Sequence, residues 1–350
     1  MFDEIPAVPT TRAHWDVYYQ KCVLNILFTV DTEVFPLVPR WREERLASDI
    51  KRDIYGEVDG RAVGLGYQLE TFKKNGLKAS FMLESMSSAV PEVGMEPLKE
   101  IVRAIRAGGH DMQLHPHTEW IPYIPNFEVP YRSHLLNAYP LSEQEAIIKF
   151  AKKQLVKAGA RTPVAFRAGG FAADANTLTA LNRNGIRYDS SYNSFYAADK
   201  CKIPTPAVMG HVTEINGVKE LPAAVFEDWP SHMRHAQLCA ISSREMVHAL
   251  ETAERDGWEF FVIISHSFEM LSRRRHPTKP PVIREAVVKR FEKLCKFLGD
   301  NKDRFRTLGF SDLNTHLKIE KKEKTIKGRL ANTATRTIEQ AMNKGKLKFF

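Results

Sequence analysis

Short segments rich in β-branched and aromatic residues alternate along this chain with longer segments that show helical periodicity. This alternation predicts a mainly parallel sheet whose strands are joined by right-handed helical crossovers. The predicted strands are residues 23–30, 78–83, 111–115, 163–167, 186–190, 218–221 and 260–265, and the predicted helices are residues 64–74, 96–107, 142–158, 176–184 and 242–256. The loops that follow such strands gather at one edge of the sheet, where we expect the functional residues.

Two acids, Asp31 and Glu33, stand where the first predicted strand ends. At the two-residue period of a strand their side chains point to the same side. Neighbouring carboxylates repel each other unless a cation lies between them. One explanation for the pair is that one acid binds a metal and the other acts as a general base. The other explanation is that both acids face solvent or a helix N-terminus.

A second polar cluster follows the strand at 111–115. His115, His117 and Glu119 alternate if the chain stays extended, and they then converge on one face. If a helical turn begins after Pro116, His115 and Glu119 become neighbours instead. Imidazole and carboxylate groups suit zinc and other divalent first-row metals. The cluster therefore predicts metal ligands, with structural histidines as the alternative.

Two further candidates also follow strands. Arg167 stands at a strand end, where it orients a carboxylate, fixes an anion or forms a surface salt bridge. Gly169 and Gly170 come next and allow close backbone approach or positive φ. His266 follows the apolar strand at 260–265, a position that suits acid–base chemistry because imidazole titrates near neutral pH. A core histidine bonded to a carbonyl is the alternative there.

The pair Asp228–Trp229 is the last candidate. An indole beside an acid makes a good wall for stacking a sugar. The same pair is also a common way to complete a hydrophobic core, so its role is open on the residues alone.

Taken in order, the segments TVDTE, GHDMQLHPHTEW, FRAGG, EDW and IISHS resemble the motifs of the polysaccharide deacetylase (NodB-like) family. The resemblance covers about residues 23–310. The remote branch found in surface-polysaccharide (O-antigen and lipopolysaccharide) gene clusters is most similar, because DTE, LHPH, FRAGGF and HSFEML occur together. The resemblance implies an α/β fold, an irregular (β/α)7 barrel that forms a single catalytic domain.

The resemblance also assigns roles to the site residues. It implies that Asp31 is the general base, that His266 is the general acid and that Arg167 holds Asp31. It places Asp228, Trp229, Gly169 and Gly170 in substrate binding.

The metal, expected to be zinc, would be held by Glu33, by His115 and by a third ligand. The family commonly has adjacent aspartates, whereas Thr32 separates two acids here, so the ligand falls on Glu33. In the common histidine motif the second position corresponds to Glu119. His117 is favoured slightly as the third ligand, because neutral imidazole is the commoner partner.

These assignments imply a metal-dependent hydrolase that removes an N-acyl group, in the first instance acetyl, from an amino sugar in surface-polysaccharide or glycolipid biosynthesis. One alternative is a hydrolase of another C–N bond on the same fold, acting on a formamide or a cyclic ureide. A second is a non-catalytic carbohydrate-binding protein with a decayed site.

Charge is concentrated near the C-terminus. The net charge is +9. Residues 318–350 hold eight lysines and two arginines against three glutamates, a charge of +7. The nearly neutral remainder argues against a nucleic-acid partner. We expect an N-terminal arm at 1–22, the barrel at 23–310 and a basic tail at 311–350.

The tail is expected to form a helix with Ile326, Leu330 and Ile338 that packs on the barrel or binds anionic lipid headgroups, or else to be disordered.

The first 20 residues lack a basic segment followed by an apolar one, so we expect a cytoplasmic protein. It would be peripheral on the inner membrane face if the tail binds lipid. A cytoplasmic location in turn favours a nucleotide- or lipid-linked substrate. The four scattered cysteines are expected to be reduced.

Overall fold

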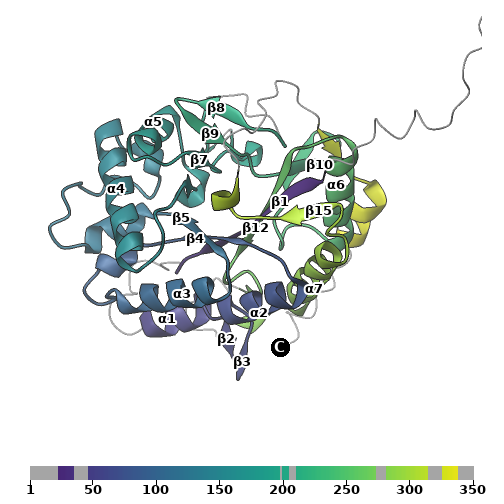
Figure 1. Cartoon of the computed structure of the whole chain (residues 1–350), viewed down its shortest axis with the longest axis horizontal. Coiled ribbons are helices and arrows are strands. Elements are labelled where there is room, and N and C mark those ends of the chain that lie inside the picture. Colours follow the sequence, from purple (N-terminus) through teal and green to yellow (C-terminus); the bar gives the residue numbers. More distant parts are fainter. Residues whose placement is uncertain are drawn as a thin grey trace, which may run out of the picture.

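The computed structural model describes residues 23–34, 46–197, 199–204, 210–272, 281–313 and 325–337. Their main feature is a nine-stranded sheet that curls into an open half-barrel (Figure 1). The strands follow the order β12 (Phe260–His266), β1 (Leu24–Thr32), β4 (Ser80–Leu83), β5 (Asp111–Leu114), β6 (Ala165–Phe166), β7 (Tyr188–Asp189), β9 (Val218–Glu220) and β8 (Thr213–Ile215), while β15 (Phe305–Thr307) pairs with the start of β1. All these pairs are parallel except β8–β9.

The predicted strands and helices are all confirmed, with shifts of a few residues at their ends. The α-helices are α1 (Leu46–Asp53), α2 (Leu65–Asn75), α3 (Glu96–Ala107), α4 (Leu141–Lys157), α5 (Ala175–Arg183), α6 (Ser243–Arg255) and α7 (Glu285–Asp300). Short 3-10 helices are η2 (Met86–Ala89), η3 (Thr118–Tyr123), η4 (Leu136–Ala138), η5 (Gly169–Phe171), η6 (Ser194–Tyr196) and η7 (Phe310–Asp312). Among the described residues, no helix is both long and apolar enough to cross a membrane.

Strand β1 is the centre of the sheet. Its side chains are buried except for that of Asn25, which is partly exposed, as expected for a parallel strand covered on both faces. Phe28 on β1 packs edge-to-face against Phe72 of α2 and Phe291 of α7, with ring centroids 5.0 and 6.0 Å away. This packing fixes β1 between its neighbours. The register with β12 then sets Asp31 directly beside His266.

Smaller sheets stand beside the main one. They comprise the set β11 (His232–His235), β10 (Val225–Trp229) and β16 (Ile326–Lys327), the pair β13 (Leu271–Ser272) and β14 (Val282–Ile283), and the pair β2 (Glu57–Val58) and β3 (Arg61–Ala62). Backbone amides of Ala224 and Leu238 donate to the carbonyls of Val262 and Ile264 on β12, at 3.1 Å each. The chain beyond β9 therefore meets the opposite edge of the curled sheet.

Part of the C-terminal segment packs on the body of the protein. Residues 330–337 are helical, and Arg336 is 5% exposed. Its guanidinium donates to Asp228 at 2.7 Å and to Glu245 at 3.0 Å. Ile326 is buried, whereas Leu330 is 55% exposed and Ile338 lies outside the described residues. The described part of the tail thus packs on the body of the protein, which is one of the alternatives expected from the sequence.

Candidate metal centre and active site

The candidate residues lie where strands end. Asp31 and Glu33 come from the end of β1, His115 and His117 follow β5, and Arg167 and His266 stand at the ends of β6 and β12. Parallel strands bring these ends to one edge of the sheet. All of these residues except Arg167 line a cleft of about 660 Å³. A cleft of this size suits a small-molecule ligand.

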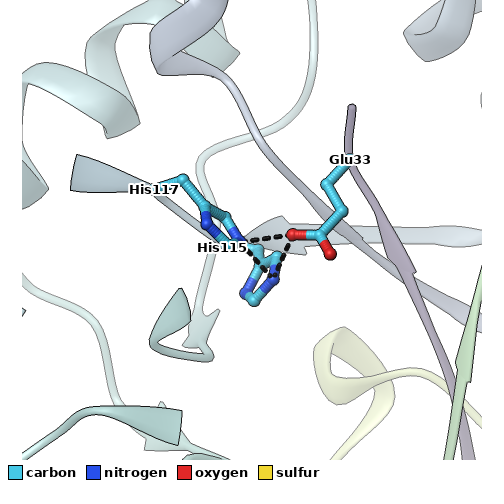
Figure 2. A group of neighbouring side chains, drawn as sticks. All are labelled: Glu33, His115 and His117. Atoms are coloured by element: carbon cyan, nitrogen blue, oxygen red, sulfur yellow. Dashed lines mark hydrogen bonds and ion pairs between the residues drawn. The ribbon is translucent and has the colours of Figure 1, made fainter. Parts of the chain in front are cut away.

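Glu33, His115 and His117 point toward one another (Figure 2). Oε2 of Glu33 lies 3.2 Å from Nε2 of His115 and also contacts Nε2 of His117, and the two ring nitrogens are 3.2 Å apart. All three side chains are buried or nearly so. One carboxylate oxygen and two imidazole nitrogens form a donor set that fits a divalent metal such as zinc, with a position left for water or substrate.

Each imidazole is oriented from its far side. Nδ1 of His115 donates to the carbonyl of Arg167 at 2.9 Å, which leaves the lone pair of Nε2 directed at the centre. Nδ1 of His117 lies 3.4 Å from Oε1 of Glu119. Partners of this kind fix the tautomer and ring orientation of metal-binding histidines. The structure therefore brings His117 to the centre and places Glu119 behind it.

The charges at this centre favour a cation. Burial would raise the pKa of Glu33, but the neighbouring His117 and His115 rings lower it well below its ordinary value. Burial would lower the pKa of His117, but Glu33 and Glu119 raise it well above its ordinary value. A positive charge among these side chains is thus stabilised, and a bound metal would supply it.

Asp31 is held by a buried arginine. Arg167 is 0% exposed, and its Nη1 donates to Oδ1 of Asp31 at 2.6 Å and to Oγ1 of Thr29 at 2.8 Å. Its Nε and Nη2 donate to the carbonyl and the hydroxyl of Ser190, at 3.1 Å each. Oδ2 of Asp31 then lies 4.0 Å from His115 and faces the cleft. One carboxylate oxygen is fixed and the other remains available for a proton.

His266 faces the same carboxylate. Its Nε2 lies 3.8 Å from Oδ2 of Asp31. On the other side of the ring, Nδ1 accepts from the amide nitrogen of Gln237 at 3.4 Å and lies 3.9 Å from Oε1 of Glu269. Glu269 is 4% exposed, accepts from Gln237 at 2.6 Å and accepts from the His266 backbone N–H at 3.2 Å. Sequence reasoning did not single out Gln237 and Glu269, although an acid three residues after the histidine was a usable signal.

The glycines after Arg167 have a steric role. A Cβ atom at Gly169 would lie 3.0–3.2 Å from three atoms of the His117 ring. Gly170 has φ +60°, a backbone conformation that L-residues rarely adopt. Both glycines line the cleft. Gly169 lets the backbone pass close to the His117 ring, and Gly170 allows the left-handed turn that follows.

Asp228 and Trp229 lie elsewhere. Neither is among the residues that line the cleft. The Asp228 carboxylate is 2% exposed and binds Arg234 at 2.6 Å and Arg336 at 2.7 Å, while Trp229 is 57% exposed at the end of β10. Two arginines therefore occupy the Asp228 carboxylate. The pair lies outside the cleft, whereas the sequence resemblance predicted that it binds substrate.

A carboxyl pair lies beneath the Arg167 loop. Asp189 and Glu220 are paired in the register of β7 and β9, and both are fully buried. Burial raises the pKa of Asp189, and burial together with the adjacent Asp189 raises the pKa of Glu220 well above its ordinary value. Both directions favour one proton shared by the pair. Ser191 donates to Asp189 at 2.6 Å and accepts from the Ala168 N–H at 2.9 Å, which connects the pair to the loop that follows Arg167.

We expect Glu220→Gln to stabilise the protein at neutral and alkaline pH. The folded wild type keeps a proton that the unfolded chain releases above about pH 4.5, so this pair costs stability as pH rises, by up to about 1.4 kcal/mol per pH unit until the folded pKa is passed. Glutamine carries the required N–H permanently. Urea unfolding at several pH values should show the advantage of the variant growing with pH, whereas the exposed neighbour variant Glu214→Gln should show none. An advantage independent of pH would contradict the shared proton.

Comparisons with known proteins agree with this architecture. No family model and no curated protein matches the sequence. Among solved structures, one from Mycobacterium smegmatis, whose assignment as a polysaccharide deacetylase is itself provisional, is 16% identical over 92% of this chain and 100% of its own, with a TM-score of 0.52. A 4-alpha-glucanotransferase from Thermococcus litoralis is 12% identical over 93% of this chain and 47% of its own, with a TM-score of 0.53. The family 4 carbohydrate esterase from Streptomyces lividans gives a TM-score of 0.42 at 12% identity, over 82% of this chain and 92% of its own. At these identities the first two structures show only that this chain shares their fold. Its function has to be inferred from the residues of the site.

Proposed function

We propose that this protein is a metal-dependent hydrolase that removes an N-acyl group, in the first instance acetyl, from an amino sugar, using an irregular (β/α)7 barrel. The observation that carries the proposal is the meeting of Glu33, His115 and His117 beside an aspartate that Arg167 holds in place. When bound, a divalent ion such as zinc would polarise the amide carbonyl and lower the pKa of a water molecule to about 7.

Asp31 is the general base of this mechanism. Its Oδ2 faces the cleft beside the three metal-binding side chains, so it accepts the proton of the attacking water. Arg167 binds the other oxygen, which prevents the carboxylate from turning. General bases positioned in this way typically contribute about 10²–10⁴ in rate.

His266 supplies the proton that the leaving amine needs. Because Nδ1 accepts from Gln237, the neutral ring carries its proton on Nε2, the atom that faces Asp31. The ring acts as the acid in its doubly protonated form, so that Nε2 gives its proton to the departing amine and the ring returns to the neutral state. The Glu269 carboxylate lies 3.9 Å from Nδ1, on the other side of the ring. Gln237 and Glu269 are positioning residues in this scheme.

The same side chains argue against glycosyl transfer, which the glucanotransferase with this fold performs. Glycosyl transfer of the retaining kind needs two carboxyl groups, one of them free to bond to the sugar. Here Glu33 faces two imidazole rings, and Asp31 is paired with Arg167. These two carboxylates are thus arranged for metal-assisted hydrolysis. The other two acids that line the cleft are also engaged, because Glu119 contacts His117 and Glu269 accepts from Gln237.

The test is an assay of the zinc-loaded full-length protein on matched N-acetylated and N-formylated amino sugars, free and in nucleotide- and lipid-linked forms. Acetate release supports the proposal, and preference for a linked form supports a role in surface-polysaccharide or glycolipid biosynthesis on the cytoplasmic side. Release of formate alone favours the formamide hydrolase. Sugar binding without release of either acid favours a non-catalytic carbohydrate-binding protein.

A further inference from the structure

One wall of the cleft is aromatic. Phe171 follows Gly170 and has φ +62°, a left-handed conformation that is rare for a bulky residue. Its ring stacks on that of Tyr196 from η6, with centroids 5.4 Å apart and planes inclined by 17°. Both residues line the cleft. Strained residues of this kind cluster at ligand sites. This one presents a ring directly after the glycines that pass behind His117.

A lysine stands against the same wall. Lys200 lines the cleft, and its Nζ lies 5.7 Å from the centre of the Tyr196 ring. Its ammonium group forms no ion pair with a carboxylate among the described residues. The nearby acids differ in this respect, because Glu119 contacts His117 and Glu269 accepts from Gln237. Within the described part of the chain, the Lys200 ammonium therefore has no carboxylate partner.

We propose that Phe171, Tyr196 and Lys200 form a subsite for an anionic sugar. The aromatic rings take the apolar face of a sugar ring, and the Lys200 ammonium binds a carboxylate or phosphate group that the sugar carries. This inference rests on the proposed function, for which it names the substrate class. The ring supplies affinity for any pyranose, whereas the lysine supplies discrimination, because a charged hydrogen bond in a partly enclosed cleft is stronger than a neutral one.

The anion has two chemical sources, the carboxylate of an amino hexuronic acid and the phosphate of a glycosyl phosphate. Both present oxygen acceptors to one ammonium donor, so the structure points to their shared chemistry. Three probes separate them: N-acetylglucosamine, its uronic acid and its 1-phosphate. Binding of each to the zinc-loaded full-length protein is measured by calorimetry at low and at high salt.

We expect at least one anionic probe to bind about tenfold or more tightly than the neutral sugar at low salt, with the preference shrinking at high salt. Lys200→Met should remove most of this preference and leave the affinity for the neutral sugar within about twofold. Tyr196→Ala should lower the affinity for all three probes by the same factor, because stacking of a sugar on the ring does not depend on charge. The matched control is Lys149→Met, on the exposed side of α4, which should change none of them.

Equal binding of neutral and anionic probes would overturn the inference, as would a Lys200→Met variant that keeps the preference. These readouts are separate from turnover. A protein that prefers anionic sugars but releases no acetate keeps the subsite and loses the proposed function. A protein that deacetylates neutral and anionic sugars with equal KM keeps the function and loses the subsite.

Discussion

Asp31→Asn is expected to lower kcat by about 10²–10⁴ without preventing metal binding, because the amide has the shape of the carboxylate and cannot accept the proton of the attacking water. Its Oδ1 can still accept from Nη1 of Arg167, so the loop should keep its place. Steady-state acetate release by the zinc-loaded variant measures the loss. Metal content measured on the same sample shows whether the centre is intact.

The substitution also removes the counter-charge of a fully buried arginine, which typically costs about 3–5 kcal/mol of stability. The assay must therefore be run well below the unfolding transition of the variant. Ser190→Ala is the matched control, because it weakens the same Arg167 network and leaves Asp31 unchanged. We expect that control to lose less than about tenfold. A variant Asp31→Asn that retains wild-type kcat would remove Asp31 from the mechanism.

The main elements and most of the cleft residues were predictable because their signals are local. A buried apolar strand that ends in acids, as β1 does at Asp31 and Glu33, marks both a strand and a sheet edge. Parallel pairing then places His266 beside Asp31, since β12 is another apolar strand of similar length. What the alternation of elements could not predict is how the sheet curls, because curvature depends on twist and packing along every strand.

The choice between His117 and Glu119 was not predictable from spacing. The chain stays extended through His117, at φ −116° and ψ 119°, and the 3-10 helix η3 begins at Thr118. His117 therefore keeps the strand alternation with His115 and reaches the centre, while Glu119 turns away and supports His117 from behind. A shift of this boundary by a residue or two would have exchanged their roles, and helix boundaries are the least certain part of sequence interpretation.

Long-range partners explain the other differences. Asp228 stands beside a tryptophan, as a substrate-binding acid would, but its carboxylate binds Arg336 from the C-terminal segment, 108 residues away. Tyr196 and Lys200 belong to no motif and reach the cleft only because η6 packs beside the loop that holds Phe171. Neither contact leaves a periodic pattern in the sequence.

Removal of the metal is expected to abolish turnover, and zinc added back should restore it. The metal-free protein should also unfold at lower temperature, because an ion that binds only the folded state stabilises it by about 2.7 kcal/mol at a concentration 100 times its Kd. Glu33→Gln should bind zinc far more weakly, since it loses the one anionic donor of the centre. Glu119→Gln should have a smaller effect on zinc affinity than Glu33→Gln. Loss of a residue that supports a metal-binding histidine typically lowers metal affinity by about 10–100-fold.

The pH dependence of zinc binding separates a metal centre from a simple ion pair. In the metal-free protein the carboxylates of Glu33 and Glu119 raise the pKa of His117 well above its ordinary value, against the opposing effect of burial. Zinc must therefore displace a proton that this ring holds more tightly than a free imidazole does. Apparent affinity should then fall by about tenfold for each unit that pH drops, as for one displaced proton. Glu119→Gln lowers that competing pKa while it weakens the support of the ring, so its deficit in zinc affinity should be largest at high pH and shrink as pH falls. Full turnover by protein shown to be free of metal would rule out the mechanism, because Asp31 alone cannot both activate water and polarise the amide.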